Sequence, residues 1–366
     1  MRIMYLTTAR HPHDYEMFLK KYKKAPNPSN QNFHNKLINI LRSKFPLGAF
    51  STRPMEKNVF LTQSKSDYFY YPGYINTPIL KRLGIITAGL QYYEARTPKV
   101  IFVDTLNVTL LELARRLKKR HNVKVIGIVT DNPINITGAS KNYSQDIFKK
   151  SLVCDGFISL TQGLLRLFNP KQKPAIIVPG FIEEAESFTN KKEKYAFFAG
   201  ALYPKYGVDA LIKTFRELNP PFKLVIAGHG PLADDLLENK HPNIEFLGQV
   251  CPPVAFRLAQ RAYVNINPRP IDEQVDLYSV PSKVIDYINS GSVTISTENT
   301  EIRNLVGDNI YFIKDAEPHT ILEALNAINK NYNYYKQRAA EAKKALVKAL
   351  DNKVLINKIE DLINKI

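Results

Sequence analysis

The stretch that decides the fold runs from Val264 to Thr297 and reads V-N-I-N-P-R-P-I-D-E-Q-V-D-L-Y-S-V-P-S-K-V-I-D-Y-I-N-S-G-S-V-T-I-S-T. Asn267-Pro268 ends the first apolar run, and Pro281, a residue favoured in the first turn of a helix, follows a polar loop. Ser290-Gly291 is a common helix end. The stretch therefore predicts a buried strand, a polar loop, a helix and a second strand, at 264–266, 269–278, 279–290 and 292–297.

The start of this predicted helix faces the polar loop and suits an anion. The first turn of a helix has backbone N–H groups without partners inside the helix, and the helix dipole makes that end positive. Pro281 has no N–H, so Ser282 and Lys283 must supply the donors. We therefore expect this helix start to attract a phosphate group.

The same residues resemble the nucleotide-sugar site of family-4 glycosyltransferases of the GT-B fold. The run Y-S-V-P-S-K-V-I-D-Y-I-N-S-G at 278–291 is similar to a variant common in bacterial exopolysaccharide and capsule enzymes. The wider family has two glutamates separated by seven residues, and these positions fall on Tyr278 and Asp286. The resemblance implies that Asp286 binds the ribose hydroxyls of the donor. Tyr278 has no carboxylate, and Glu273 and Asp276 lie nearby at a different spacing.

The resemblance covers about 195–315 and includes a loop after the first strand of this region. The run G-A-L-Y-P-K-Y-G, 200–207, resembles a family loop G-R-x-x-x-K-G, whose arginine and lysine bind the donor diphosphate. Lys205 keeps the lysine, and the alternative is that it is a solvated loop lysine. Ala201 replaces the arginine, and Arg269 is the natural cation to restore the second charge. The family places the nucleobase near turns that match Gly228-His229-Gly230 and Gly248-Gln249-Val250.

The first half of the chain shows alternating strand and helix patterns. The apolar run 100–104, the amphipathic run 109–120 and the apolar run 123–129 predict a parallel, doubly wound sheet, in which ligands bind at the carboxyl ends of the strands. Asp131 follows such a strand. The family often has a histidine here that approaches the donor sugar, so the resemblance implies that Asp131 touches a sugar. The alternative is a turn-forming aspartate before Asn-Pro.

Two further segments of the first half each leave two interpretations open, and a third departs from the pattern of GT-B enzymes. The tyrosine-rich run 66–77 is either an acceptor platform or packing under a loop. The basic helix end 115–121 either faces an anionic bilayer or is solvated. The run P-S-N-Q-N-F-H-N at 28–35 replaces the glycine-rich loop that GT-B enzymes have after the first strand.

Length and composition predict two domains, and they also bear on the location of the protein in the cell. A chain of 366 residues with 44% apolar residues exceeds the usual single domain, and no run approaches the length of a membrane span. Residues 1–8 read as a strand and not as a signal peptide. Cys154 and Cys251 lie in unrelated contexts, which favours free core thiols and a reducing cytoplasm.

The net charge of +17 requires an explanation in terms of partners or of background composition. Nucleic acid, an anionic membrane surface and anionic substrates such as sugar diphosphates all attract a basic protein. The chain has no zinc-finger spacing, RNP-like aromatic run or basic tail, so nucleic acid is not expected. Scattered histidines without partners at ligand spacing give no metal site.

We predict an α/β chain, and the resemblance implies a GT-B fold of two Rossmann-like, doubly wound parallel-sheet domains that face an interdomain cleft. The polar run 183–194 marks the boundary between the halves. The predicted parts are an acceptor-side domain, a linker, a nucleotide-sugar domain and a helix that packs back on the first domain: 1–182, 183–194, 195–345 and 346–366.

The resemblance implies a retaining glycosyltransferase that moves a hexose from a nucleotide sugar, by family habit a UDP-sugar, without metal or cofactor. It implies a lipid-linked or growing polysaccharide acceptor at the cytoplasmic membrane face. The alternatives are an inactive relative that binds a sugar or a partner, and a protein O-glycosyltransferase. Each of these functions is compatible with a homo-oligomer. Asp131, Lys205 and Arg269 are the candidate catalytic residues. The candidate donor-binding residues are Gly200, Lys205, Gly228, His229, Gly230, Arg269, Tyr278, Ser279, Val280, Pro281, Ser282, Lys283 and Asp286.

Overall fold

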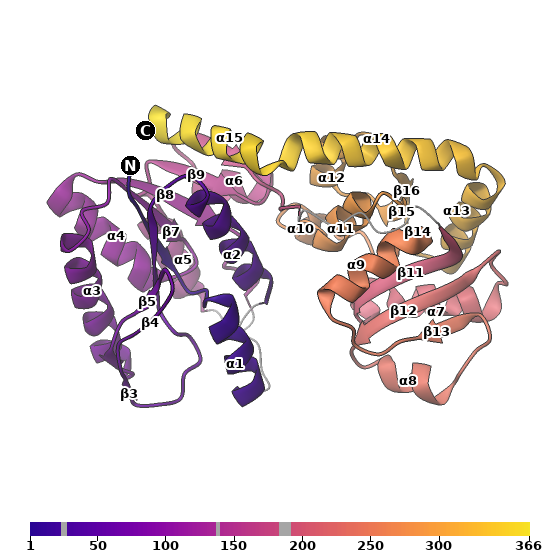
Figure 1. The fold of residues 1–366 in the computed structure, drawn as a ribbon, viewed down its shortest axis with the longest axis horizontal. Coiled ribbons are helices and arrows are strands. Elements are labelled where there is room, and N and C mark those ends of the chain that lie inside the picture. Colours follow the sequence, from indigo (N-terminus) through magenta and orange to yellow (C-terminus); the bar gives the residue numbers. More distant parts are fainter. Residues whose placement is uncertain (23–27, 137–139, 183–191) are drawn as a thin grey trace. The chain divides into compact units, whose positions relative to one another are not determined.

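A computed structural model describes residues 1–366 except 23–27, 137–139 and 183–191. The chain divides into two units, and most of the predicted linker lies outside the described residues. Unit 1 consists of Met1–Pro179 together with Asn352–Ile366, and unit 2 is Gly180–Asp351. The end of the predicted linker is not a linker in the structure, because strand β11 of unit 2 begins at Glu193. Figure 1 shows the elements of both units.

Unit 1 is built on an eight-stranded sheet with the order β10-β9-β8-β7-β1-β2-β5-β4. All neighbours are parallel except β4 and β5, and β3 and β6 form a separate antiparallel pair. The strands are β1 Ile3–Thr7, β2 Leu47–Ser51, β3 Phe60–Leu61, β4 Ser64–Ser66, β5 Phe69–Tyr71, β6 Tyr74–Ile75, β7 Val100–Asp104, β8 Lys124–Val129, β9 Gly156–Ser159 and β10 Ala175–Ile177.

The central strands of unit 1 are apolar along their length because helices cover both faces of the sheet. Helices α3, α4 and α5 pack in sequence on one another, while α15 packs against α2 and β10. The helices are α1 Pro12–Tyr22, α2 Pro28–Arg42, α3 Pro78–Glu94, α4 Val108–His121, α5 Lys141–Ser151, α6 Gln162–Phe168 and α15 Asn352–Lys365.

The C-terminal helix of unit 1 begins later than the predicted start at 346. Helix α14 continues to Leu350 within unit 2, and Asp351 then takes an extended conformation that interrupts the helix. Leu355, Ile359 and Leu362 of α15 are buried. Their spacing of three and four residues places them on one face of the helix. The return to unit 1 therefore occurs where the helical hydrogen bonding is broken.

Unit 2 is a six-stranded, fully parallel sheet with the order β13-β12-β11-β14-β15-β16. The chain runs outward from β11 in one direction and from β14 in the other, so the topology reverses between these two strands. Crevices at such a switch point are the usual binding sites of open α/β sheets. The strands are β11 Glu193–Ala201, β12 Lys223–His229, β13 Ile244–Phe246, β14 Ala262–Asn267, β15 Val293–Thr297 and β16 Tyr311–Ile313.

Two apolar layers hold the helices of unit 2 to its sheet. One lies beneath α7 and α13, and the smaller one packs Phe197 and Tyr287 beneath α9 and α11. The helices are the 3-10 turn η1 Pro204–Tyr206, α7 Val208–Glu217, α8 Ala233–Glu238, α9 Pro252–Arg261, α10 Glu273–Asp276, α11 Ser282–Ser290, α12 Thr300–Val306, α13 Pro318–Lys330 and α14 Tyr332–Leu350.

The strand, loop, helix and strand predicted from 264–297 are confirmed as β14, α11 and β15. Helix α11 ends at Gly291, which has the left-handed φ of 76°. The polar loop predicted at 269–278 lies before α11, and part of it is helical. It contains the one-turn helix α10, which the side chain of Asp272 caps by accepting hydrogen bonds from the N–H groups of Gln274 and Val275.

Candidate functional site

A cavity of about 310 Å³ opens at the carboxyl ends of β11 and β12 in unit 2. It lies beside the switch point of the sheet, where the connections reverse direction. One wall is apolar and comes from α9, and the other comes from α11. The lining residues are Phe197, Ala199, Gly200, Ala201, Ala227, Gly228, His229, Gln249, Val250, Pro252, Ala255, Phe256, Ala259, Lys283, Asp286 and Tyr287.

Lys283 is the cation of this cavity. Its Nζ lies 4.7 Å from the centroid of the Phe198 ring and 5.7 Å from that of Tyr206. Burial and, as the smaller cause, the positive charge of Arg269 together lower the pKa of Lys283 to about 8. A buried ammonium between aromatic rings and a second cation favours an anion as its partner.

Gly200 provides the space that Lys283 occupies. A Cβ at position 200 would collide with Nζ and Cε of Lys283. The neighbouring Gly228 has a φ of 151°, and a Cβ there would collide with the carbonyl oxygen of Gly200. The two glycines therefore let the ends of β11 and β12 approach each other and leave room for the lysine.

Arg269 is held next to Lys283 by two side chains. Its guanidinium donates a hydrogen bond of 3.0 Å to Ser279 Oγ and lies 3.5 Å from Asp276 Oδ1. The backbone carbonyl of Arg269 accepts a hydrogen bond of 2.6 Å from the Thr297 hydroxyl. Burial raises the pKa of Asp276, although the charge of Arg269 acts in the opposite direction. Asp276 thus fixes the arginine in place.

Lys205 lies outside the set of residues that line the cavity, and its side chain is exposed. Its Nζ is 5.2 Å from the centroid of the Tyr206 ring, the same ring that Lys283 approaches. Gly207, with a φ of 71°, packs directly against the carbonyl oxygen of Pro268, so the loop of Lys205 is in contact with the loop of Arg269. The three predicted cations are therefore grouped at one edge of unit 2.

The structure divides the predicted donor-binding residues into two groups. Gly200, Gly228, His229, Lys283 and Asp286 line the cavity, and Asp286 is exposed one turn after Lys283. Those that do not line it are Lys205, Gly230, Arg269, Tyr278, Ser279, Val280, Pro281 and Ser282.

The second group has identifiable positions around the site. Gly230 lies against the backbone of Leu202, whose oxygen would be 2.6 Å from a Cβ at position 230. Ser279 accepts from Arg269 and donates to Val275. Tyr278 and Val280 are half-buried on either side of it. Pro281 is the N-cap of α11 and has no capping group, so the first N–H groups, those of Ser282 and Lys283, have no cap from that residue.

The wall formed by α9 was missed by the sequence reasoning. Pro252, Ala255, Phe256 and Ala259 follow one another at intervals of three, one and three residues, which places them on one face of a helix. This spacing was visible in the sequence, but periodicity does not tell whether such a face packs on a core or lines a cavity. Tyr287 was also missed. Its buried hydroxyl accepts a 2.9 Å hydrogen bond from the Ala199 N–H and fixes the end of β11.

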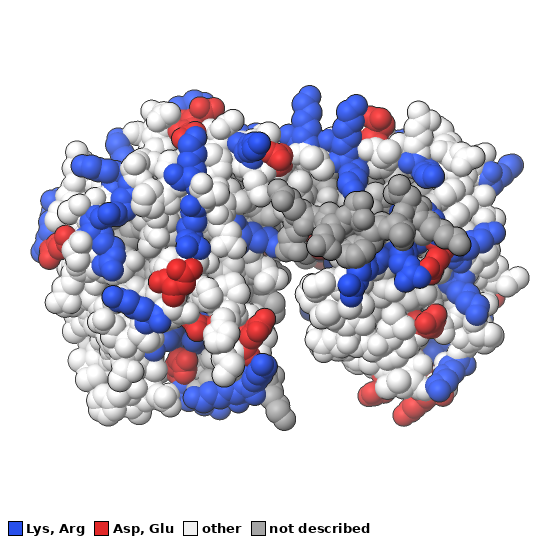
Figure 2. Space-filling view, viewed as in Figure 1, with Lys and Arg blue, Asp and Glu red and all other residues white. Residues whose placement is uncertain are grey.

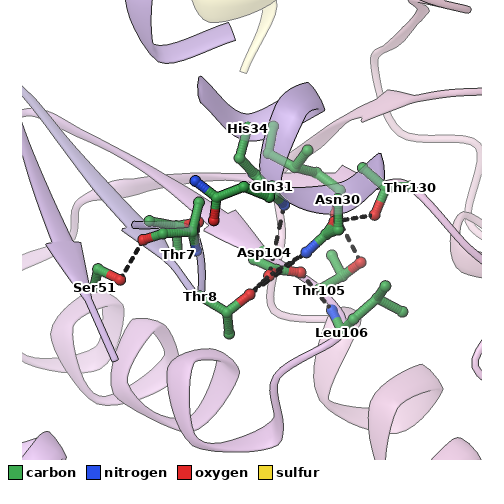
Figure 3. Close-up of polar contacts among 12 residues, drawn as sticks. Thr7, Thr8, Asn30, Gln31, His34, Ser51, Asp104, Thr105, Leu106 and Thr130 are labelled. Carbon is green, nitrogen blue, oxygen red and sulfur yellow. Dashed lines mark hydrogen bonds and ion pairs between the residues drawn. The ribbon is translucent and has the colours of Figure 1, made fainter. Parts of the chain in front are cut away.

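Unit 1 has a polar cluster at the switch point of its own sheet, between β1 and β7 (Figure 3). The buried carboxylate of Asp104 accepts a 2.8 Å hydrogen bond from the Thr8 hydroxyl and lies 3.5 Å from His34 Nε2. Asn30 approaches the same carboxylate at 3.4 Å and accepts a 2.7 Å hydrogen bond from Thr130. The run 28–35, which forms the start of α2 in place of a glycine-rich loop, thus contributes Asn30 and His34 to this cluster.

Opposing effects set the charge of Asp104. Burial on its own raises the pKa of this carboxyl, but the charge and hydrogen bond of His34, with the hydrogen bonds from Thr8 and from the Leu106 N–H, lower it overall. A cavity of about 180 Å³ adjoins the cluster. Among the described residues that line it, Asp104 is the only charged one, so this cavity favours hydroxyl-bearing groups over anions.

Asp131 does not line the unit 1 cavity. Its carboxylate accepts a 2.8 Å hydrogen bond from the N–H of Asn132, and Asn132 in turn accepts one from the N–H of Ile134. The contact two residues on, which is typical of an Asx-turn, is therefore made by Asn132 and not by Asp131. Burial raises the pKa of Asp131.

The aromatic run of unit 1 serves packing in the structure. Phe69, Tyr71 and Tyr74 are buried, and Tyr70 packs against Tyr92 at 4.8 Å between centroids. The basic end of α4 is largely occupied by intramolecular contacts: Lys118 lies 2.6 Å from Asp155, Arg120 lies 3.5 Å from Glu94 and His121 stacks on Tyr93.

Three simple features of the chain complete the description. Within the described residues, no group of three or more His, Cys, Asp or Glu side chains is arranged to hold a metal ion. A search of the described helices finds none that combines the length and apolar character needed to span a bilayer. Cys154 is buried as expected, whereas Cys251 is exposed next to the cavity, because it precedes the first turn of α9.

Comparisons with known proteins agree with this architecture. Residues 193–331 match the family described as Glycosyl transferases group 1. Sucrose-phosphate synthase from Thermosynechococcus elongatus has a similar structure, with 10% identity, a TM-score of 0.67 and coverage of 100% of this chain and 98% of that one. HepE from Anabaena, solved with UDP, shares 12% identity with a TM-score of 0.67 over 100% of both chains.

A third similar structure is TarM from S. aureus, at 14% identity and a TM-score of 0.57, over 81% of this chain and 62% of that one. No curated protein matches the sequence significantly. At these identities the solved structures establish the fold, and the family match establishes the type of domain in unit 2. Residues 193–331 form a group 1 glycosyl transferase domain, and the chain is a transferase of the GT-B fold.

Proposed function

We propose that the chain is a retaining glycosyltransferase that takes a hexose from a nucleotide sugar, with UDP as the favoured nucleotide. The observation that supports this most directly is Lys283, a half-buried cation that stands between an apolar wall and a second cation, Arg269, at the carboxyl edge of a parallel sheet. A nucleoside diphosphate needs this combination of an apolar slot and positive charge. Structures of the similar HepE include complexes with UDP and with UDP-glucose.

The diphosphate is assigned to the start of α11. Lys283 and Arg269 supply positive charge there, and the N–H groups of Ser282 and Lys283 point out of the first helical turn. The leaving nucleoside diphosphate gains negative charge as the bond to the sugar breaks. Fixed cations that are already in place stabilise this charge without reorganisation, so they contribute to the rate and not only to binding.

The base and the ribose are assigned to the two walls of the cavity. The α9 wall of Pro252, Ala255 and Phe256 offers an apolar surface of the kind on which a planar base packs. Asp286 lines the cavity from α11, and a carboxylate at this position accepts hydrogen bonds from the ribose hydroxyls in the proposed complex. Lys205, which is also exposed, is assigned a secondary role at the mouth of the site.

The acceptor is assigned to unit 1 and is proposed to be a lipid-linked or growing oligosaccharide. The unit 1 cavity offers a carboxylate, amides and hydroxyls from Asp104, Asn30, Gln31 and Thr8, which suits a neutral sugar. Asp131 is kept as a candidate sugar contact. Its half-buried carboxyl, with a raised pKa, follows β8 at the same edge of the sheet.

A thermal-shift panel of UDP-, GDP- and dTDP-sugars tests the donor assignment. We expect one nucleotide class to raise the melting temperature, and Lys283→Ala to remove most of that increase. Lys213→Ala, on the exposed face of α7 in the same unit, is the matched control and should leave the increase intact. A full shift in Lys283→Ala, or no shift with any nucleotide sugar, would contradict the proposal.

A sugar- or partner-binding relative without activity is the second candidate, because the first family glutamate and the loop arginine are replaced by Tyr278 and Ala201. Donor turnover distinguishes the two. We expect slow hydrolysis of the donor that gives the thermal shift, measured as free nucleoside diphosphate. Binding without any release of nucleotide, in the presence and absence of acceptors, would favour the binding protein.

A further inference from the structure

A group of exposed apolar side chains lies at one end of unit 1 and has no role in either cavity. The short sheet of β3 and β6 pairs Phe60 with Ile75 and Leu61 with Tyr74. Leu61 and Tyr74 are buried, whereas Phe60 is 71% exposed and Ile75 is exposed beside it. Because side chains alternate between the faces of a strand, Phe60 and Ile75 share the outer face of this small sheet.

The first turns of α3 continue the same surface. Ile79, which is 74% exposed, and Leu83 lie four residues apart on one face of the helix, and Leu80 is exposed between them. Helix α3 packs on β6, where Gly84 fits closely against Tyr74. These residues, Val59, Phe60, Ile75, Ile79, Leu80 and Leu83, are called the apolar patch below.

The loops beneath the apolar patch are held in place by polar contacts. Arg53 donates hydrogen bonds of 2.6 Å and 2.7 Å to the carbonyl oxygens of Thr62 and Pro72. The side chain of Asn76 donates to the carbonyl oxygens of Glu56 and Asn58. The exposure of the apolar side chains is therefore a property of a fixed surface.

The positive charges of the same stretch, 53–83, outnumber the negative ones. Its two carboxylates are in ion pairs, Glu56 with the buried Arg10 at 3.2 Å and Asp67 with Arg42 at 3.4 Å. Besides Arg53, its cations are Lys57, Lys65, Lys81 and Arg82. Lys57, Lys65 and Arg82 are exposed, and Lys81 is half-buried over the Tyr74 ring. Figure 2 shows the end of unit 1 around β3 and the start of α3 as largely uncharged, with basic side chains nearby.

We propose that the apolar patch inserts into the interfacial layer of a membrane that contains anionic phospholipids. Apolar side chains of this size gain free energy on leaving water, and the neighbouring lysines and arginine complement anionic headgroups. A second copy of the chain is a poorer occupant, because it would bring the same cations against each other in a protein whose net charge is +17.

The position of the apolar patch gives this contact a direction. Pro54, which lines the unit 1 cavity, leads directly into the stretch that contains Val59 and Phe60. The C-terminal end of α3 is followed by residues that contact Arg2, just before β1, and that lead into β7. The start of α3 therefore lies at the opposite edge of the sheet, where β1 and β7 end. The membrane would thus face the edge that holds Thr8 and Asp104, not the basic end of α4.

Sedimentation with sucrose-loaded vesicles tests the proposal, using 30% phosphatidylglycerol in phosphatidylcholine against pure phosphatidylcholine. We expect the wild-type chain to bind the anionic vesicles at least about tenfold more strongly than the neutral ones. The double variant Phe60→Ser/Ile79→Ser should lower binding to the anionic vesicles by about tenfold or more. Lys57→Gln/Arg82→Gln should lower binding to anionic vesicles only.

The control is Met17→Ser/Leu237→Ser, which removes two comparably exposed apolar side chains elsewhere and should leave vesicle binding unchanged. The readout contains no nucleotide, so it does not depend on the proposed donor site, and donor thermal shifts should be the same in all these variants. Equal binding by wild type and Phe60→Ser/Ile79→Ser would overturn the proposal. So would analytical ultracentrifugation showing a wild-type dimer that this variant converts to a monomer.

Discussion

The ammonium group of Lys283 fills the space in which a side chain at Gly200 would lie. This relationship joins two segments that are far apart in the sequence, the end of β11 and the first turn of α11. It also explains why a lysine can be buried at the cavity, since no other residue type at position 200 would leave room for it. Several consequences can be measured.

Gly200→Ala is expected to weaken binding of the nucleotide sugar by about tenfold, because the added methyl group displaces the ammonium and removes a charged hydrogen bond to the diphosphate. Gly200 also has a φ of 156°, so an alanine there strains the backbone and stability should fall as well. Isothermal titration calorimetry and thermal unfolding measure the two effects. Gly307→Ala is the matched control, since Gly307 has a positive φ but open space around it. Equal losses in both variants would mean that backbone strain, not Lys283, is responsible.

Donor affinity is expected to fall as the pH rises through about 8, where Lys283 loses its proton. The folded pKa lies below the ordinary lysine pKa of 10.5, so the unfolded chain holds more protons between these values and this group makes stability rise with pH in that window. A bound diphosphate favours the charged form of Lys283 and therefore raises the pKa of this lysine again. Dissociation constants from pH 6.5 to 10 test this, and Lys283→Arg should flatten the profile. A wild-type profile that is flat up to pH 10 would contradict the assignment.

Arg269→Gln is expected to have two opposite effects. Loss of its charge weakens donor binding at pH 7 by about tenfold. It also removes a cation that lowers the pKa of Lys283, so the midpoint of the alkaline decline should move to higher pH. The same pH series measures both. Arg303→Gln, an arginine of unit 2 paired with Glu298 and Asp308, removes the same charge from the chain and should change neither value.

Asp104→Asn in unit 1 is expected to lower the free energy of unfolding by about 1–3 kcal/mol, because it removes the buried carboxylate that accepts hydrogen bonds from the Thr8 hydroxyl and the Leu106 N–H. The depressed pKa of Asp104 means that its contribution is present above the unfolded pKa and is lost as the pH falls through the folded value. Urea unfolding at pH 7 and at pH 3 tests both statements. Glu217→Gln, which removes an exposed ion pair on α7, should cost less than about 1 kcal/mol. A similarly small cost for Asp104→Asn would contradict the structural role.

The secondary structure around the candidate site could be predicted because its signals are local. Asn267-Pro268, Pro281 and Ser290-Gly291 are residues that end or begin elements through their own backbone preferences, and β14, α11 and β15 lie where these residues place them. The break between α14 and α15 lacks such a signal. The sequence A-L-D-N-K at 349–353 contains no proline or glycine, so the predicted boundary at 346 missed the true one at Asp351.

The cavity itself was harder to foresee, because burial depends on which segments meet. The sequence directed attention to Lys205 as the phosphate lysine, yet its side chain is exposed and Lys283 is the cation that lines the cavity. The apolar spacing of α9 was present in the sequence, but the same spacing would serve a helix that packs on a core. The apolar patch of unit 1 could not be foreseen either, because the exposure of Phe60 and Ile79 depends on which segments the fold packs against them.

By itself, the sequence of this protein determined the strand, loop, helix and strand at 264–297 and the division into two α/β units, but not the α9 wall of the site. These follow from periodicity, turn residues and capping, which act over a few neighbouring residues. Only the tertiary structure decided that Lys283 lies against Gly200 beside Arg269, that His34 meets Asp104, and that Phe60 stays in water. Such choices depend on contacts between distant segments, where the packing of one side chain sets the solvation and the charge of another.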